Sequence, residues 1–208
     1  MESIKNLFRI GHGPSSSHTM GPSLAADQFR ARTPNATRYR VSLYGSLAAT
    51  GKGHLTDAAV KGVFAPVPAE FVWKPDEELP MHPNGMIFEA LDEMDTPFER
   101  WQGYSIGGGA ILGEGEYQSS KTIYSLDNMQ DILRKCTQDG KTFWEYVEDN
   151  EGPEIWDYLK EILRVMHASI ERGLNTEGVL PGGLGLARHA WTIYRKIQMS
   201  GGHLKKEG

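Results

Sequence analysis

The chain has 208 residues, of which 39% are hydrophobic and 24% are charged, which is enough apolar material for one large or two small globular domains. Its net charge of −5, with 22 scattered basic residues against 27 acidic ones, argues against a nucleic-acid partner, which needs a basic face. No apolar run reaches the roughly 18–20 residues of a membrane span, and the N-terminus lacks a secretory signal. We expect a soluble, cytoplasmic protein without nucleic-acid or membrane partners.

The first 125 residues predict an α+β domain. Three stretches show the period-two alternation of strands, and the last two are spaced as a hairpin: 38–44, 86–91 and 98–106. Short helices are expected after the serine-rich loop and after the next glycine loop: 24–29 and about 56–62. Residues 65–85 are rich in proline, which indicates a loop or an edge segment. We therefore predict a mixed or antiparallel sheet with packed helices.

From about residue 126 the pattern becomes helical. Asp127 with Gln130, and Thr142 with Glu145, have the spacing of capping boxes. An amphipathic stripe begins at residue 155 and predicts a long helix that ends near residue 173, and a further helix is expected at 187–197. The predicted division is a β domain at 1–125 and a helical extension at 126–208.

Four polar clusters fall at predicted turns or strand ends, at 15–19, 50–54, 82–85 and 105–109. Each combines glycine or proline backbone with His, Ser, Asn or Lys. Such loops present N–H groups and hydroxyls to a small anion such as a carboxylate, and a histidine can transfer a proton near neutral pH. Taken alone, each cluster is also explained as a helix cap, a solvated loop or a turn. Their repetition favours a site for an amino acid.

Metal chemistry is limited by the side chains available. Four histidines lie near the loops, but none has the i, i+4 pairing of strong zinc motifs: His12, His18, His54 and His82. The single cysteine, Cys136, makes no intrachain disulfide, which is typical of a reducing compartment. One thiol also cannot hold an iron–sulfur cluster, which needs three or four. We expect no metal site in this chain alone.

Five ordered motifs resemble the signatures of a known enzyme family. They are GPSSSHTMGP at 13–22, YGSL with TGKGHLTD within 44–57, HPNGM at 82–86, YSIGGG at 104–109 and RG with NTEGVLPG within 172–182. Together they make the chain similar to the iron–sulfur-dependent L-serine dehydratases, also called L-serine ammonia-lyases. The matching part is the N-terminal β-domain portion with the start of the α domain.

The resemblance implies a fold similar to the allosteric substrate-binding domain of phosphoglycerate dehydrogenase and an enzyme that converts L-serine into pyruvate and ammonia. It implies a [4Fe-4S] cluster, held by cysteines of the α domain, that activates the serine hydroxyl. It makes His54 the base that removes the α-proton. The residues implied on the substrate side are Ser16, Ser17, His18, Thr19, Lys52, His82, Asn84, Ser105 and Gly107.

Two departures from the family pattern shape the expected function. The segment between Phe64 and His82 is shorter than in the family, and the cluster-binding cysteines are absent. We therefore expect this chain alone to be inactive and free of the cluster. Its expected partners are L-serine and a catalytic α domain in the same or a separate chain, with a homo-oligomer as a further option. The alternative is a regulatory amino-acid-binding module without chemistry of its own.

Overall fold

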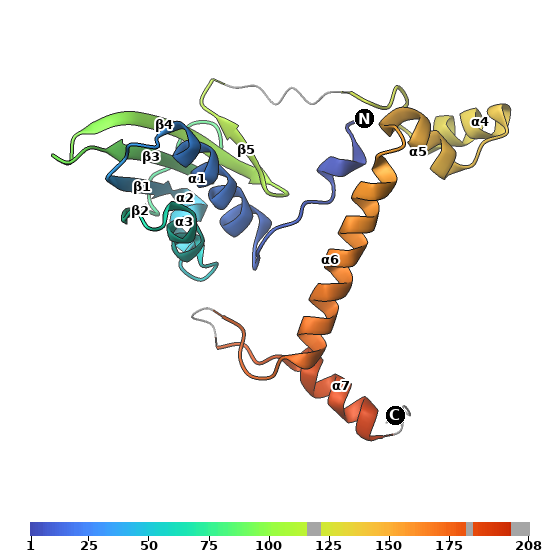
Figure 1. Cartoon of the computed structure of the whole chain (residues 1–208). Helices are drawn as coiled ribbons and strands as arrows, with labels where there is room; N and C mark the ends of the chain where they lie inside the picture. The colour runs from blue at the N-terminus through green and yellow to red at the C-terminus, as the bar shows by residue number, and fades with distance from the viewer. Residues whose placement is uncertain (116–121, 182–184, 201–208) are drawn as a thin grey trace. The chain divides into compact units, whose positions relative to one another are not determined.

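The computed structural model describes residues 1–115, 122–181 and 185–200, and the chain divides into two compact units (Figure 1). The β unit comprises residues 11–120. The helical unit combines residues 1–10 with residues 121–208. The first ten residues therefore make their contacts with the helices rather than with the sheet. The division into a β domain and a helical extension at residue 125 stays a prediction.

The β unit is built on a five-stranded mixed sheet with the order β2-β1-β3-β4-β5. Its strands are β1 (Arg38–Tyr44), β2 (Ala69–Lys74), β3 (Gly85–Leu91), β4 (Pro97–Gly107) and β5 (Ala110–Gly113). β1 and β2 are parallel, and the other neighbours are antiparallel. The α+β fold and the hairpin are confirmed, and the proline-rich segment supplies the edge strand β2.

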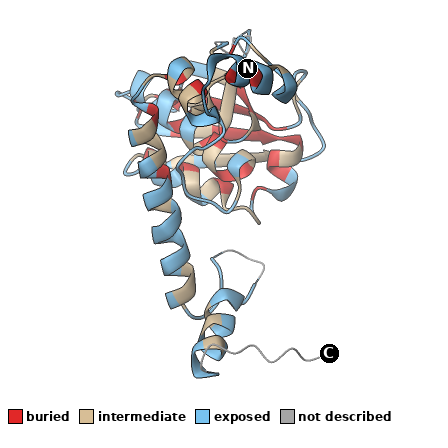
Figure 2. Ribbon diagram, turned by 90° about the vertical axis from the view of Figure 1, so that its right-hand side faces the viewer, coloured by how far each residue is buried: buried red, intermediate tan, exposed pale blue. Residues whose placement is uncertain are grey.

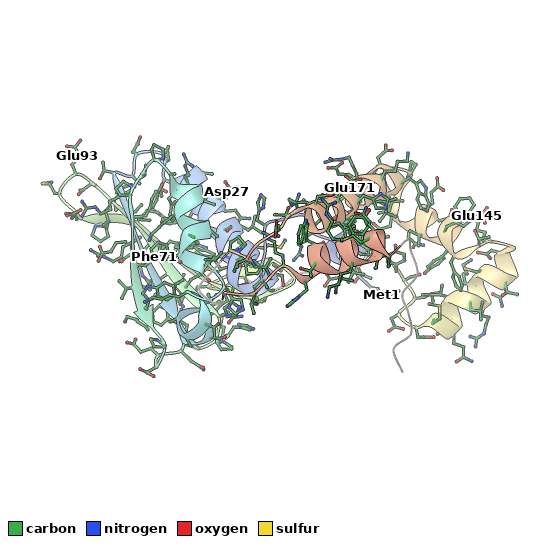
Figure 3. The ribbon with its side chains drawn as sticks, turned by 90° about the horizontal axis from the view of Figure 1, so that it is seen from below. Met1, Asp27, Phe71, Glu93, Glu145 and Glu171 are labelled. Carbon is green, nitrogen blue, oxygen red and sulfur yellow. The ribbon has the colours of Figure 1, made fainter. Side chains whose placement is uncertain are left out.

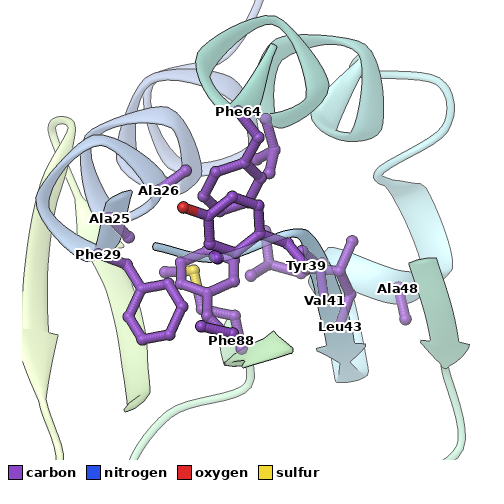
Figure 4. Packing of buried hydrophobic residues seen from close by; sticks show 14 residues of the cluster. Ala25, Ala26, Phe29, Tyr39, Val41, Leu43, Ala48, Phe64 and Phe88 are labelled. Carbon is purple, nitrogen blue, oxygen red and sulfur yellow. The ribbon is translucent and has the colours of Figure 1, made fainter. Parts of the chain in front are cut away.

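Three helices cover one face of this sheet: α1 (Gly21–Arg32), α2 (Gly45–Thr50) and α3 (Thr56–Phe64). The alternation in β1 sends Tyr39 and Val41 toward them, into a core where the rings of Tyr39 and Phe64 stack 3.8 Å apart (Figure 4). Phe88 of β3 contacts both Phe64 and Phe29. These rings are fully buried or nearly so, and each such burial stabilises the fold by roughly 1.5–3 kcal/mol.

The opposite face of the sheet carries the polar positions of the same alternation. Arg40 of β1 lies 3.7 Å from Glu70 of β2 and 3.7 Å from Glu89 of β3. Because directly opposed residues in neighbouring strands share a face, these charges form a row across the sheet. The two chemically distinct faces fix the register, since a slip of one residue would exchange them.

The helical unit contains the short turn η1 (Ile4–Asn6) and the helices α4 (Met129–Asp139), α5 (Phe143–Glu151), α6 (Ile155–Asn175) and α7 (His189–Met199). The capping box of Thr142 and Glu145 is confirmed. The other predicted cap is wrong by one residue, because Asn128 rather than Asp127 accepts the bond at the start of α4. The predicted end at Gly173 is also wrong, because α6 continues to Asn175.

α6 is exposed over most of its length (Figure 2). Of its apolar residues, Ile155 and Ile162 are buried, while Leu163, Met166 and Ile170 are each more than half exposed. Across the described parts of the chain, no helix is both long enough and apolar enough to cross a membrane.

A buried carboxylate fastens the first residues of the chain to the helices. Glu151, at the end of α5, is 8% exposed. It accepts hydrogen bonds from Ser3 Oγ (2.7 Å), the Ile4 N–H (2.7 Å) and the Tyr124 hydroxyl (2.8 Å). The N-terminal ammonium of Met1 donates to the Tyr124 carbonyl at 2.8 Å. Figure 3 labels Met1, and also Glu145 of α5. Burial alone would raise the pKa of Glu151, but these donors outweigh it and lower the pKa.

We expect Glu151→Gln to reduce the opening free energy of the helical unit by about 1–3 kcal/mol at pH 7, because three donors lose a charged acceptor. The lowered pKa in the folded state means that the carboxylate stabilises fully above its ordinary pKa of 4.5 and progressively less as the pH falls through the folded value. Amide hydrogen exchange of α5 peptides measures this. Glu148→Gln on the same helix is the control, and equal effects of the two changes would contradict the assignment.

Candidate functional site

The strand order brings three of the four polar clusters to one end of the sheet. β3 runs antiparallel to both β1 and β4, so the end of β1, the start of β3 and the end of β4 lie together. The start of α2 after Tyr44, the loop that precedes Gly85 and the last residues of β4, which include Ser105, are therefore neighbours. The Ser46 N–H donates to the Pro83 carbonyl at 3.0 Å, and the Ser105 N–H donates to the Asn84 carbonyl at 3.0 Å.

The serine-rich loop joins this end through a π-helical turn, η2 (Ser16–Met20), that leads directly into α1. Ser15 caps the turn, because its Oγ accepts from the His18 N–H at 3.1 Å. π turns are rare and occur frequently at functional sites. This one buries His18 and Thr19, which are 9% and 3% exposed, and leaves Ser16 exposed.

Two reciprocal hydrogen bonds tie this turn to the glycine loop at 51–55. The Thr19 hydroxyl donates to the His54 carbonyl at 2.8 Å, and the Thr56 hydroxyl donates to the His18 carbonyl at 2.5 Å. Between His54 and Thr56, Leu55 has a left-handed backbone with φ of 58°, which costs roughly 1–2 kcal/mol for such a residue. The two bonds offset this strain and bring the rings of His18 and His54 to 4.8 Å.

Both ring nitrogens of His18 are engaged. Nε2 lies 3.3 Å from the Ser46 carbonyl and 3.2 Å from Ser46 Oγ, and Nδ1 lies 2.9 Å from Ser17 Oγ. Because a carbonyl oxygen can only accept, we assign the proton of neutral His18 to Nε2, and Nδ1 accepts from Ser17. Burial and the charge of His54 lower the pKa of His18, and the bond to Ser46 opposes them. His18 is therefore neutral at physiological pH.

His54 has the opposite tautomer. Its Nδ1 lies 3.0 Å from the Thr50 carbonyl, so the ring proton is on Nδ1 and donates to that oxygen. The lone pair is then on Nε2. His54 is only half-buried, so of the two neighbouring imidazoles it is the one with a basic nitrogen available to a ligand.

A second group of polar atoms lies at the start of β3 and the end of β4. The Asn84 N–H donates to His82 Nδ1 at 3.0 Å, and Asn84 Nδ2 donates to the Ser105 carbonyl at 3.2 Å. Asn84 Oδ1 and Ser105 Oγ are buried and, in the described part of the chain, have no hydrogen-bond partner. Such orphaned atoms are uncommon and call for a ligand, a water or a functional explanation.

α1 approaches β4 so closely that its first residue has to be glycine. A Cβ added at Gly21 would lie 2.2 Å from Ser105 Oγ and 3.0 Å from Ser105 Cβ. This contact connects the helix that follows His18 to the strand that carries Ser105. It places the backbone of Gly21, close to the histidine pair, directly against the side chain of Ser105 in the Asn84 group.

The predicted site residues are thus mostly gathered at one end of the β unit. Direct contacts join Ser17, His18, Thr19 and His54, and the Ser46–Pro83 bond connects them to the group of His82, Asn84 and Ser105. Two residues are directed elsewhere. Lys52 Nζ lies 5.4 Å from the centre of the Trp73 ring, and Gly107, with φ of 101°, begins the turn between β4 and β5. The chemical roles of all these residues stay predictions.

Sequence reasoning overlooked Ser46 and Thr56 as site residues. Ser46 is the neighbour of His18 Nε2, and Thr56 holds the His18 carbonyl. Thr56 is the first residue of α3, which begins without any side-chain cap. The sequence feature that could have identified them is their position in the second motif, close to Gly45 and His54.

Comparison with known proteins agrees with this arrangement. A family model described as serine dehydratase beta chain matches residues 3–68 and 63–116, which together exceed half of the chain. The chain therefore belongs to the serine dehydratase β-chain family, and the resemblance drawn from the five motifs is confirmed at that level.

Individual relatives carry the name L-serine dehydratase. The protein of Haemophilus influenzae is 34% identical over 95% of this chain and 55% of its own length. L-serine dehydratase 1 of Escherichia coli is 31% identical over 96% of this chain, and the protein of Streptomyces coelicolor is 32% identical over 96%. In each case the chain spans 55% of the relative's length.

The comparison also locates a difference from these relatives. The alignment with the Haemophilus influenzae protein runs over 249 positions, while 95% of the 208 residues supplies about 198. About 50 aligned positions of the relative therefore have no counterpart here. The two family-model matches meet at residues 63–68, between the end of α3 and the start of β2. This agrees with the shortening expected between Phe64 and His82.

The side chains of this chain do not fit an iron–sulfur cluster. Cys136 is the single thiol of the sequence and is buried within α4, with its Sγ 4.0 Å from the Thr142 carbonyl. Clusters need three or four thiolates. Among the residues that the structure describes, no three His, Cys, Asp or Glu side chains are placed to hold a metal ion.

The electrostatic link within the histidine pair can be measured. In His54→Gln the pKa of His18 should rise toward its ordinary value, because the charge of His54 is one cause of its lowering. Nuclear magnetic resonance titration of the imidazole protons in the full chain measures the midpoint. His82→Gln, which leaves the pair intact, serves as the control. An unchanged His18 midpoint in His54→Gln would exclude the coupling.

The close approach of α1 to β4 gives a structural prediction. Gly21→Ala should destabilise the β unit by about 1–3 kcal/mol, because the new methyl group overlaps Ser105. Adding Ser105→Gly removes both obstructing atoms, so the double variant should be more stable than the sum of the single effects predicts. Hydrogen exchange of β1 and β3 peptides reports the change. Simple additivity would contradict the contact.

Proposed function

We propose that this chain is the substrate-binding portion of a cytoplasmic L-serine ammonia-lyase, which converts L-serine into pyruvate and ammonia. In this proposal a catalytic α domain, in the same or a separate chain, completes the active site. Membership of the serine dehydratase β-chain family and the names of the relatives support the reaction class. The observation that carries the proposal is the close pair of His18 and His54, with ring centres 4.8 Å apart and a basic nitrogen on His54.

His54 is the proposed general base. Its Nε2 accepts the proton from Cα of L-serine, and the β-hydroxyl takes up one proton in return from the imidazolium and leaves as water to give aminoacrylate. The imine tautomer of aminoacrylate then takes up water and yields pyruvate and ammonia. The Nδ1–H bond to the Thr50 carbonyl stabilises the imidazolium that forms. Neutral His18, engaged at both nitrogens, adds no like charge at 4.8 Å. A base positioned in this way contributes roughly 10²–10⁴-fold in rate.

The remaining polar groups are proposed to orient the substrate. Ser16 lies on the turn beside the histidine pair, where its hydroxyl suits the carboxylate of an amino acid. Ser17 donates its proton to His18 Nδ1, so we propose that it acts on the substrate side by holding that ring. Asn84 Oδ1 is an acceptor without a partner among the described residues and suits the substrate ammonium. Ser105 is completely buried against Gly21, so we propose that it acts mainly by positioning α1.

The cofactor of the complete enzyme is proposed to lie outside this chain. The family resemblance implies a [4Fe-4S] cluster, and the one buried thiol here cannot supply its ligands. We therefore assign the cluster to the α domain and expect the chain alone to lack both cluster and dehydratase activity.

His54→Gln in the complete enzyme, with the α domain present, should lower kcat by about 10²–10⁴-fold and change KM little, because a base acts in the transition state. Formation of pyruvate from L-serine measures both constants. His12→Gln, at an exposed position of the first loop, is the matched control. Nearly normal turnover of the His54 variant would remove His54 from this role.

A regulatory amino-acid-binding module is the second candidate, favoured by one observation: the loops of the site belong to a single compact unit. Calorimetry with L-serine separates the two functions. Binding that requires the α domain supports the shared active site, whereas millimolar binding to this chain alone supports the module. Analysis of the chain alone should detect no iron or sulfide in either case. A bound cluster would contradict the assignment of the cluster to the α domain.

A further inference from the structure

Strand β2 forms one edge of the sheet, with β1 on its inner side. Edge strands offer unpaired backbone groups to another chain. The register defines which groups these are. The Tyr39 N–H donates to the Pro68 carbonyl at 2.9 Å, and Tyr39 pairs with Ala69 in the parallel ladder. The backbone groups of the even-numbered residues of β2 therefore face β1, and those of Ala69, Phe71 and Trp73 face outward.

The sequence of β2, AEFVWK, is complementary to itself when two copies run antiparallel with Val72 at the two-fold axis. In that register Phe71 of one copy lies opposite Trp73 of the other, and both residues present outward backbone groups, so each such pair can exchange two N–H···O bonds. Glu70 lies opposite Lys74, and the two Val72 residues face each other. Shifting the register by two residues would lose the Glu70–Lys74 pairing.

The side chains of the paired residues also share the correct faces. Glu70, Val72 and Lys74 lie on the polar face, where Glu70 already belongs to the row with Arg40. Phe71 (Figure 3) and Trp73 lie on the helix-covered face, where their rings are 6.2 Å apart and half-buried. Opposite charges and paired aromatics each stabilise antiparallel strands, so the complementarity holds on both faces at once.

The comparison with relatives explains why this edge is accessible in this chain. About 50 aligned positions of the Haemophilus influenzae protein are missing here, and the family-model matches meet at residues 63–68, immediately before β2. We infer that the additional polypeptide of the relatives belongs at this junction, next to the edge strand. Pro68 and Pro75 bound the strand and limit pairing to its six residues.

We propose that β2 is an interaction surface for a second copy of this chain, and that two β2 strands pair antiparallel about Val72 to join their sheets. The interface is isologous, as a two-fold dimer requires. A pairing of one short strand lies at the small end of specific interfaces, so the dimer should form in a concentration-dependent equilibrium. This inference does not depend on the proposed dehydratase function.

A charge exchange at the edge tests the pairing by sedimentation velocity of the full chain over a concentration series. Glu70→Lys or Lys74→Glu alone should raise the dissociation constant about tenfold or more, because both symmetry-related pairs become like-charged. The combined exchange restores opposite charges and should recover most of the affinity. Glu99→Lys, the same change of charge at an exposed position of β4, is the control.

Two results would overturn the proposal. One is a wild-type chain that stays monomeric at all concentrations. This is expected if Lys74 and the flanking prolines prevent the edge strand from pairing with another chain. The other is a dissociation constant that the changes at Glu70 and Lys74 leave unaltered, together with loss of self-association in Met166→Glu. That result would place the interface on the exposed face of α6.

Cysteine cross-linking tests the register independently, in a Cys136→Ala background. At the two-fold axis the Cα atoms of residue 72 should be about 4.5 Å apart, a separation that a disulfide spans. Val72→Cys should therefore form a covalent dimer on mild oxidation. Glu70→Cys, whose symmetry mates would be roughly 13 Å apart, should not. Equal cross-linking of both variants would contradict the register.

Discussion

The pair of hydroxyl–carbonyl bonds between the loops of His18 and His54 is the interaction on which the site depends. Each loop is irregular, and each contains a feature that an isolated peptide would not keep: a π turn in one and a left-handed leucine in the other. Thr19 and Thr56 hold these features together by exchanging bonds with the opposite backbone. Because the threonines bind carbonyls rather than rings, the imidazoles stay free to differ in tautomer.

That difference in tautomer gives two similar side chains different chemistry. His18 has its proton on the nitrogen that faces Ser46 and accepts from Ser17, so it is fixed in place and kept neutral. His54 donates to the Thr50 carbonyl at the end of α2, which leaves the lone pair on its other nitrogen. Hydrogen-bond geometry thus distinguishes the imidazole with both nitrogens engaged from the one with a lone pair, and the proposed roles are based on this difference.

The sequence predicted features that depend on local pattern. Strand β1 and the hairpin of β3 and β4 follow from alternation, and the Thr142 capping box follows from spacing. Features that join distant residues were missed. The Glu151 carboxylate binds Ser3 across 148 positions, and no periodicity signals such a contact. For the same reason Ser46 was read as part of a motif rather than as the neighbour of His18.

The internal segment that is shorter than in the relatives lies away from the histidine pair, as the sheet topology shows. β2 is parallel to β1, with Ala69 beside Tyr39, so the junction at 63–68 lies at the end of the sheet where β1 begins. The histidine pair lies at the end where β1 finishes. α3 spans this distance, starting at Thr56 next to His18 and finishing at Phe64 in the core. The junction at 63–68 is thus at the opposite end of the sheet from the hydrogen bonds around His18 and His54.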